Sequence, residues 1–310
     1  MKLEFNSLLD MLKVFSDEQK CIDHLAAVRW KDGIFCPHCG SLRKIHKFSD
    51  NRRYKCADCH QQFTVRVGTI FEDSKLPLQK WFMAFYLVTS HKKGISSLQL
   101  SRDITVTQKT AWFMLQRIRY IVGHSNSFDD TLGGVVEADE TYIGGKEKNK
   151  HKDKRTEGTQ GRGSQKTKAI VFGMVAREGG IKMRHIDNVQ STTISQHVEA
   201  NIAPDAFVMT DEATFYNPSS LKGRAHAKVH HSRGEYVNGP IYTNTIEGSF
   251  SHFKRCIYGI YHSVSRKHLQ KYASMFEFRW NTRDMGEGQR VNLLLSKING
   301  VHLTYKELIV

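Results

Sequence analysis

The sequence predicts an α/β protein with a large carboxyl-terminal domain behind smaller amino-terminal modules. Between residues 130 and 285, apolar runs of strand length alternate with segments of helical periodicity. Residues 31–125 instead carry two C-x-x-C pairs, followed by segments of helical periodicity only. The chain has 310 residues, of which 39% are hydrophobic, so a large core and additional modules are both possible.

Net charge is the strongest bulk feature of the chain. Lys and Arg number 46 against 31 Asp and Glu, a formal net charge of +15. This excess favours a polyanionic partner, and nucleic acid is favoured over anionic lipid because no basic amphipathic membrane helix stands out. No apolar run is long enough for a membrane span. The amino terminus lacks the apolar core of a signal peptide, which predicts a soluble, cytoplasmic protein.

Two C-x-x-C pairs with sixteen residues between them predict a zinc ribbon over residues 31–75, after a helical segment at 1–30. Each pair forms a tight turn, and two turns bring four thiolates to the roughly 2.3 Å that tetrahedral Zn²⁺ requires. Four cysteines close the coordination shell, so the site is expected to be structural. A redox C-x-x-C site needs one pair, whereas this chain has two. The predicted ligands are Cys36, Cys39, Cys56 and Cys59; Cys21 and Cys256 are expected to be ordinary buried thiols.

Residues 76–125 predict three helices with a short turn before the last, the arrangement of a helix-turn-helix. The alternative is a generic three-helix bundle, and the adjacent basic ribbon favours the DNA-binding version. The periodicity of the last helix predicts that Ala111, Trp112, Leu115 and Ile118 are buried and that Gln108, Lys109, Gln116, Arg117 and Arg119 are exposed. The predicted DNA contacts of both modules are Lys44, Arg52, Arg53, Lys109 and Arg117, for which a solvated surface is the alternative.

The carboxyl-terminal domain is predicted to be a mixed sheet flanked by helices. Three strands near residues 133–145, 168–178 and 181–188 precede a helix at 192–202. Two further strands near 206–212 and 225–232 lead to a long helix that Asn244 or Thr245 can cap. This order of elements is that of a ribonuclease-H-like fold, which we assign to residues 130–285. Residues 286–310 are expected to form a tail.

Three acids lie where such a fold brings side chains together. Asp139 and Asp211 each follow an apolar strand run, and Glu247 lies on the later helix. Three neighbouring carboxylates repel one another unless cations lie between them. Two divalent ions about 3.5–4 Å apart would neutralise the acids and clamp a phosphodiester, which predicts Mg²⁺ or Mn²⁺. Glu140 and Glu212 directly follow the first two acids and, by strand alternation, are expected to point to the opposite face.

Basic residues near these acids are candidates for contact with the DNA backbone. Lys254 follows Glu247 by seven residues and projects from the same helix face about 10 Å away. Residues 144–168 contain nine Lys and Arg against three Asp and Glu, which predicts a loop that tracks phosphates, or else a solvated insertion. His231 is either structural or in contact with the reacting groups. The predicted DNA contacts here are Lys146, Lys148, Lys150, Lys254 and Arg255.

Nearly the whole chain resembles one family, the DDE transposases of the insertion-sequence 1595 family, with an ISXO-type domain related to Merlin elements. The resemblance rests on the segments EADETYIGGKEKNKH, MTDEATFY, VHHSRGEYVNG, TNTIEGSFSHFKRCIYGIYHSVS and FEFRWNTR. It implies that Asp139, Asp211 and Glu247 are the three catalytic acids and that Lys254 is the basic residue after the third. It also implies binding of double-stranded DNA at terminal inverted repeats, metal-dependent hydrolysis that frees a 3′-OH, and transfer of that 3′-OH into target DNA.

A transposase must cut both ends of its transposable element and join them to the target together, so this interpretation predicts a homo-oligomer on DNA. It also predicts a location at the bacterial nucleoid. Two alternatives remain open. A DNA-binding regulator would use only the ribbon and the helices, and it has no use for three clustered acids. A metal-dependent nuclease that cuts without joining needs the same acids, so joined DNA products are what distinguish a transposase from it.

Overall fold

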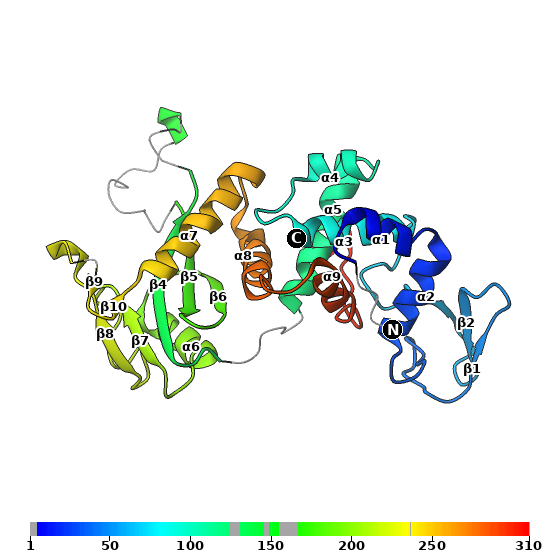
Figure 1. The fold of residues 1–310 in the computed structure, drawn as a ribbon, viewed down its shortest axis with the longest axis horizontal. Helices are drawn as coiled ribbons and strands as arrows, with labels where there is room; N and C mark the ends of the chain where they lie inside the picture. Colours follow the sequence, from blue (N-terminus) through cyan, green and yellow to red (C-terminus); the bar gives the residue numbers. More distant parts are fainter. Residues whose placement is uncertain are drawn as a thin grey trace. The chain divides into compact units, whose positions relative to one another are not determined.

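The computed structural model describes residues 5–124, 131–145, 149, 151–154, 167–235 and 237–309. The chain forms two compact units, Met1–Ser125 with Asp284–Val310, and Asn126–Arg283. We call them unit 1 and unit 2 and describe each by itself (Figure 1). None of the helices in the described ranges is both long and apolar enough to cross a membrane.

Unit 1 combines a small antiparallel sheet with a helical core. Local side chains cap several of its helices: Ser7 accepts the N–H of Asp10, and Ser96 accepts that of Gln99. The apolar helix α3 lies in the core, with Trp81 almost completely buried. The elements are α1 (Leu8–Val14), α2 (Glu18–Arg29), β1 (Ile45–Lys47), β2 (Arg53–Cys56), β3 (Gln62–Thr64), α3 (Leu78–Ser90), α4 (Ser97–Asp103), α5 (Gln108–His124), α9 (Glu287–Leu295) and α10 (Tyr305–Ile309).

The carboxyl-terminal residues are part of the unit 1 core, so the expectation of a tail over 286–310 is wrong. Val291, Leu294 and Leu295 lie on one side of α9 and are buried. Helix α9 packs on α3 and α2, where Asn292 Oδ1 lies 2.9 Å from His24 Nε2. Apolar residues at helical spacing require a partner surface, and α3 provides it.

Unit 2 is a five-stranded mixed sheet with helices on both faces, as the sequence predicts. The strand order is β6-β5-β4-β7-β8; β4, β5 and β6 pair antiparallel, whereas β4, β7 and β8 pair parallel. Its elements are β4 (Val135–Ile143), η2 (Lys152–Lys154), β5 (Ala169–Ala176), β6 (Ile181–Ile186), α6 (Ser191–Asn201), β7 (Phe207–Thr210), β8 (Ala225–Lys228), η3 (His231–Arg233), β9 (Val237–Asn238), β10 (Ile241–Tyr242), α7 (Asn244–Cys256), the π-helix η4 (Ile257–Tyr261) and α8 (Arg266–Asn281).

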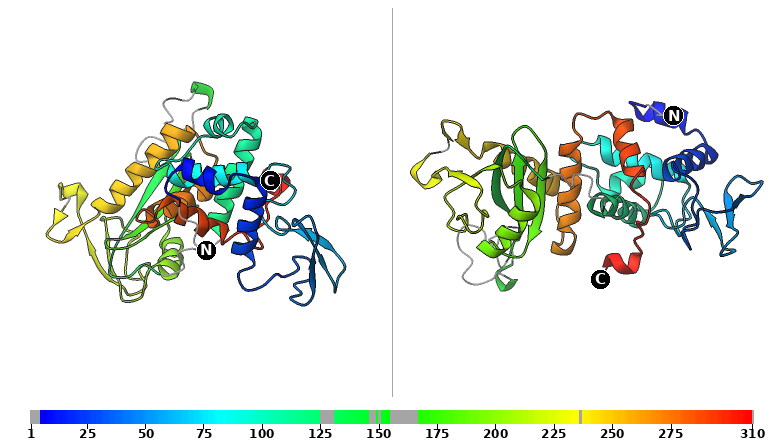
Figure 2. Two further views of the ribbon diagram at one scale, coloured as in Figure 1. Left: turned by 45° about the vertical axis from the view of Figure 1, so that its right-hand side comes forward. Right: turned by 90° about the horizontal axis from the view of Figure 1, so that it is seen from below.

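The two faces of the sheet are covered by different helices (Figures 1 and 2). Alternate residues of β4 and β5, such as Ala138 and Phe172, pack against Ile194 of α6. The intervening residues of β5, such as Val171, face Phe250 of α7 and the buried side of α8. All eight residues of β5 are buried, because this strand has neighbours on both sides and helices on both faces.

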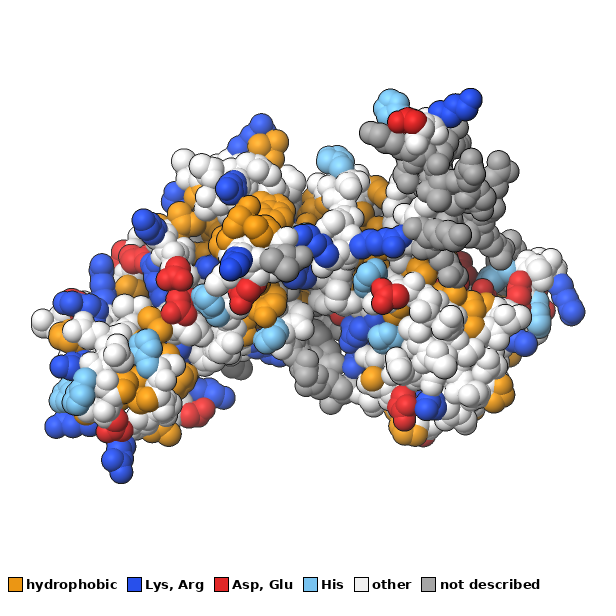
Figure 3. Space-filling model, turned by 180° about the vertical axis from the view of Figure 1, so that it is seen from behind, with side chains coloured by type: hydrophobic (Ala, Val, Ile, Leu, Met, Phe, Trp, Pro, Cys, Tyr) orange, Lys and Arg blue, Asp and Glu red, His pale blue; other side chains and the backbone are white. Residues whose placement is uncertain are grey.

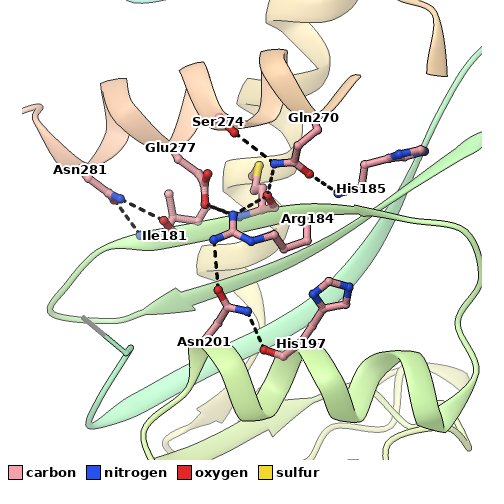
Figure 4. A network of polar contacts seen from close by, with 10 residues as sticks. Ile181, Arg184, His185, His197, Asn201, Gln270, Ser274, Glu277 and Asn281 are labelled. Atoms are coloured by element: carbon pink, nitrogen blue, oxygen red, sulfur yellow. Dashed lines mark hydrogen bonds and ion pairs between the residues drawn. The ribbon is translucent and has the colours of Figure 1, made fainter. Parts of the chain in front are cut away.

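Helix α8 also covers the backbone of the edge strand β6 with side-chain hydrogen bonds (Figure 4). Asn281 accepts the N–H of Ile181 at 2.8 Å and donates to its carbonyl at 3.0 Å. Glu277 accepts the N–H of Met183 at 2.7 Å and forms an ion pair of 2.7 Å with Arg184. These side chains take the place of a neighbouring strand, so this edge of the sheet is closed to pairing with another chain.

Candidate catalytic site and zinc centre

The four cysteines predicted as zinc ligands lie together in the ribbon of unit 1. Their sulfur atoms are all within 4.8 Å of one another, with 3.6 Å between Cys36 and Cys59 and 3.7 Å between Cys39 and Cys56. Tetrahedral coordination at about 2.3 Å places sulfur atoms about 3.8 Å apart, so this spacing fits Zn²⁺. Across the described ranges, no further group of three or more His, Cys, Asp or Glu side chains is as well placed to hold a metal ion.

The ribbon backbone favours a thiolate at one of these positions. Backbone N–H groups, first that of Cys59 and then that of Asp58, lower the pKa of Cys56 to about 7. Strands β1, β2 and β3 pair antiparallel in that order, and Trp30 packs edge-on against Tyr54 with ring centroids 4.9 Å apart. The predicted zinc ribbon is confirmed.

The first two acids of unit 2 lie on β4 and directly after β7, which are neighbouring strands. Their parallel register ends with the pair Glu137 and Met209, and Asp139 and Asp211 each follow two residues after this pair. Adjacent strands lie about 4.8 Å apart, so the two acids are neighbours. Asp211 directly follows β7 as expected, whereas Asp139 lies inside β4, because β4 continues along β5 as far as Ile143.

Helix α7 brings the third acid to the same face of the sheet. Glu247 is in its first turn, and the helix lies across the sheet through the buried side chains of Ile246 and Phe250. It approaches closely over Gly173, which is the β5 partner of Asp139. A Cβ at Gly173 would lie 2.6 Å from Phe250 Cε1, so only glycine allows this packing.

The acids influence one another electrostatically. Burial raises the pKa of Asp139 well above its usual range, and the charges of Glu140, Asp211 and Glu247 raise it further. The structure thus brings Asp139, Asp211 and Glu247 into one neighbourhood, although their oxygen atoms do not form a group as tight as the cysteine cluster. Glu140 points to the opposite face, as expected, where it accepts a 3.0 Å hydrogen bond from Tyr216.

The carboxylate of Glu247 has two neighbours in the segment before α7. Thr243 donates its hydroxyl hydrogen to Glu247 Oε1 at 2.9 Å, and His231 Nε2 lies 3.4 Å from the same oxygen. His231 therefore lies beside the third acid, and its contact with the reacting groups stays a prediction.

Lys254 lies half-buried on α7 beyond Glu247. Burial lowers the pKa of its ammonium group; the charge of Asp139 acts in the opposite direction, and that of Lys168 lowers the pKa again. Lys254 is thus near enough to Asp139 to interact with it. Arg255, the next residue, is exposed.

The other predicted DNA contacts, apart from Arg117, are either exposed or outside the described residues. Lys44, Arg52, Arg53 and Lys109 are exposed, and Figure 3 shows Lys and Arg side chains spread over the visible face rather than gathered on one element. Lys146, Lys148 and Lys150 lie outside the described residues. Exposure permits DNA contact, and these contacts remain predictions.

Arg117 is not a surface residue, and its prediction as a DNA contact is wrong. Its side chain is 4% exposed and donates to the backbone carbonyls of Leu303, Ile70 and Glu72. Burial lowers the pKa of its guanidinium group. Gln116 and Arg119 are buried as well. The exposed residues of this helix are Gln108 and Lys109 in its first turn and Gly123 and His124 at its end.

Sequence reasoning missed Glu137 and Arg177, which connect the elements that carry the acids. Glu137 is completely buried and accepts the backbone N–H groups of Thr245 and Ile246 at 2.8 and 3.0 Å. It caps α7 in place of Asn244 or Thr245; the residue before the helix is Thr243, whose side chain makes no cap hydrogen bond. The sequence did hold one sign of this structural role: Glu137 lies inside the apolar run VVEA, and a buried carboxylate requires a partner.

Comparison with known proteins places the chain in a family. Residues 131–281 match the ISXO2-like transposase domain, and residues 16–62 match the transposase zinc-ribbon domain. An uncharacterized protein in transposable element ISH50 of Halobacterium salinarum is 31% identical over 280 residues, which cover 86% of this chain and 92% of the relative.

A solved structure, the simian T-cell lymphotropic virus intasome in complex with PP2A regulatory subunit B56 gamma, aligns over 73% of this chain and 69% of that chain. Its 13% identity and TM-score of 0.26 are too low to support any conclusion. The ISH50 relative and the two matched domains are sufficient: the chain belongs to the insertion-sequence 1595 family of ISXO2-like DDE transposases, with an amino-terminal zinc ribbon.

Proposed function

We propose that the chain is the transposase of an insertion sequence, which binds terminal inverted repeats and catalyses metal-dependent phosphodiester hydrolysis and DNA strand transfer. The observation that supports this most directly is the register of β4 with β7 and the docking of α7 over Gly173, which bring Asp139, Asp211 and Glu247 to one face of the sheet. Residues from two strands and a helix, far apart in sequence, contribute negative charge to one place. A protein that only binds DNA has no use for this arrangement, because carboxylates repel the DNA backbone.

Asp139, Asp211 and Glu247 are proposed to hold Mg²⁺ or Mn²⁺. Carboxylate oxygens are the ligands that these hard cations prefer. Burial, and after it the charges of Glu140, Asp211 and Glu247, raise the pKa of Asp139, and a bound cation would offset that repulsion. When bound, the ions supply charge stabilisation for the transferring phosphoryl group. The carboxylates themselves form no covalent bond with DNA; they bind and orient.

The proposed reaction has two steps. Water attacks a phosphodiester at the end of the element, a P–O bond forms as the bond to the 3′-oxygen breaks, and that oxygen leaves as a free 3′-OH. The 3′-OH then attacks a phosphodiester of the target in the same way. Lys254 is proposed to contact the DNA backbone beside these acids, because its half-buried ammonium group is near Asp139 and attracts phosphate.

The zinc ribbon and the helices of unit 1 are proposed to bind the terminal repeats. Exposed side chains of the ribbon and of the first turn of α5 would contact phosphates, together with the basic segment at 144–168 and Arg255. Two ends must be joined in one reaction, so the active form is proposed to be a homo-oligomer on DNA. Its proposed setting is the cytoplasm, at nucleoid DNA.

A strand-transfer assay tests this function. The zinc-loaded full chain is mixed with Mg²⁺, a labelled duplex that carries the repeats flanking the gene, and a plasmid target. Asp211→Asn is compared with Asp205→Asn, which removes the same charge from an exposed position before β7. We expect joined products from the wild type and from Asp205→Asn, and none from Asp211→Asn.

Other outcomes would select other functions. Cleaved ends without joined products, in both Mg²⁺ and Mn²⁺, would contradict strand transfer and indicate a nuclease. Tight binding to the repeats with neither cleavage nor joining would contradict catalysis and indicate a DNA-binding regulator. Equal activity of Asp211→Asn and wild type would exclude Asp211 from the site.

A further inference from the structure

Glu137 is a completely buried carboxylate that lies on the same face of β4 as Asp139, two residues before it. It accepts four hydrogen bonds. Three come from α7: the N–H of Thr245 at 2.8 Å, the N–H of Ile246 at 3.0 Å and the hydroxyl of Thr245 at 3.0 Å. The fourth comes from Arg177 Nε at 2.8 Å.

This arrangement differs from the helix caps of unit 1. Ser7, Asp17 and Ser96 each cap the helix that directly follows them, so those caps fix a helix only to its own chain. The N–H groups of α7 instead bond to a residue 108 or 109 positions earlier in the chain. The start of α7 is thus fixed to β4, and a carboxylate is favourable at that end of the helix dipole.

Arg177 extends this connection to the other elements of the site. Its guanidinium group donates to Pro240 O at 2.7 Å and to Tyr242 O at 3.0 Å, and it stacks on the Tyr242 ring at 3.5 Å. It also lies 3.0 Å from Met209 Sδ on β7. Arg177 therefore holds the segment that leads into α7 and touches the strand that precedes Asp211.

The contacts of this ion pair follow a regular pattern. Glu137, Met209 and Thr245 each stand two residues before one of the three acids, Asp139, Asp211 and Glu247. Glu137 is hydrogen-bonded to Arg177, Met209 contacts Arg177, and Thr245 donates its N–H to Glu137. A shift of any one element would move its acid relative to the other two.

We propose that Glu137, paired with Arg177, is a positioning residue that sets the distance between Glu247 on α7 and the two strand acids, and thereby the affinity of the site for divalent cations. This inference rests on the proposed function. Glu137 is too deeply buried to contact DNA, so it acts only through the acids that it places. Residues that orient metal ligands commonly change metal affinity by about 10–100-fold when they are replaced.

Mn²⁺ binding to the zinc-loaded full chain without DNA, measured by electron paramagnetic resonance titration, tests the positioning role. Glu137→Gln keeps the side-chain shape but leaves Arg177 without its counter-charge, and we expect the Mn²⁺ dissociation constant to rise by at least about tenfold. Glu178→Gln is the matched control, since it removes an equal charge from an exposed neighbour of Arg177. Its dissociation constant should equal that of the wild type.

A second variant distinguishes a loss of positioning from a loss of folding. Thr245→Val removes one of the four hydrogen bonds to Glu137 and leaves both charges in place, so we expect an unchanged melting temperature of the zinc-loaded chain without added Mn²⁺ and a smaller rise in the dissociation constant. Cleavage by both variants should recover at saturating Mn²⁺, which a partly unfolded protein would not show. Folded variants that bind Mn²⁺ like the wild type would overturn the positioning role.

The two proposals fail in different ways. If wild-type protein shows no Mn²⁺ binding that Asp211→Asn abolishes, the proposed metal site is wrong. If Asp211→Asn abolishes binding while Glu137→Gln leaves it unchanged, the metal site stands and only the role of Glu137 is wrong.

Discussion

Gly173 on β5 pairs with Asp139 on β4, and the ring of Phe250 covers this glycine so closely that no Cβ fits between them. An added Cβ would lie 2.6 Å from the ring and 2.8 Å from Ile246 Cδ1. Phe250 and Ile246 flank Glu247 on α7, and both are buried. The absence of a side chain at residue 173 is therefore what allows α7 to carry its acid up to Asp139.

Gly173→Ala should destabilise unit 2 and impair DNA cleavage. Inserting a methyl group into a packed core costs about 1–3 kcal/mol, and relief requires α7 to move away from the sheet. Gly248→Ala is the control on the same helix: a Cβ there meets nothing within 4 Å, so the change should stabilise the helix by about 0.5–1 kcal/mol. Chemical denaturation measures both free energies of unfolding, and a neutral Gly173→Ala would contradict the close packing.

Asp139→Asn should raise the stability of the protein at neutral pH when divalent cations are absent. The pKa of Asp139 is raised in the folded state, so the folded state binds the proton more tightly than the unfolded state. Stability is therefore lost as pH rises from the unfolded pKa through the folded pKa, and the amide removes this loss. Thermal unfolding of the zinc-loaded protein at pH 4 and pH 7, in buffer without added divalent cations, measures the effect, which should be larger at pH 7.

Added Mn²⁺ should make the wild type more stable than Asp139→Asn at neutral pH. A ligand at a hundred times its dissociation constant stabilises the folded state by about 2.7 kcal/mol. We expect this gain for the wild type and little of it for Asp139→Asn, in the same thermal unfolding experiment. An equal gain for both proteins would place the bound Mn²⁺ elsewhere.

Removal of zinc should unfold the ribbon and abolish binding to the terminal repeats. Structural zinc contributes apparent binding free energies of about 10–16 kcal/mol in small zinc domains, and the ribbon sheet is too small to fold without it. Zinc content by mass spectrometry should be one ion per chain in the wild type and none in Cys39→Ser. Cys256→Ala, which changes a cysteine of unit 2, should retain the ion.

Arg117 and Lys109 should respond in opposite ways to substitution. Arg117→Met leaves the carbonyls of Leu303, Ile70 and Glu72 without a donor, and each unpaired buried group costs about 1–3 kcal/mol. Lys109→Ala should leave the free energy of unfolding unchanged and weaken DNA binding, with the salt slope reduced by about one. Denaturation and salt-dependent DNA titrations separate the effects; a reduced salt slope for a folded Arg117→Met would restore Arg117 as a DNA contact.

Local chemistry determined much of what could be read from the sequence. The spacing of Cys36, Cys39, Cys56 and Cys59 identified the ribbon, because each metal-binding turn spans only four residues. Strand alternation placed Glu140 on the face opposite Asp139. Turns, caps and alternation act over a few neighbouring residues, so they do not depend on the rest of the fold.

Only the tertiary structure decided which charged residues are structural. By periodicity Arg117 belonged on the exposed face of α5, but segments near residues 70 and 303 cover that face. In the sequence, little besides its apolar neighbours distinguishes Glu137 from other acids in strands. Its role depends on the sheet register and on the docking of α7, which bring Thr245 to it. A charged side chain is buried or exposed according to what packs over it from distant parts of the chain, and no local pattern contains that information.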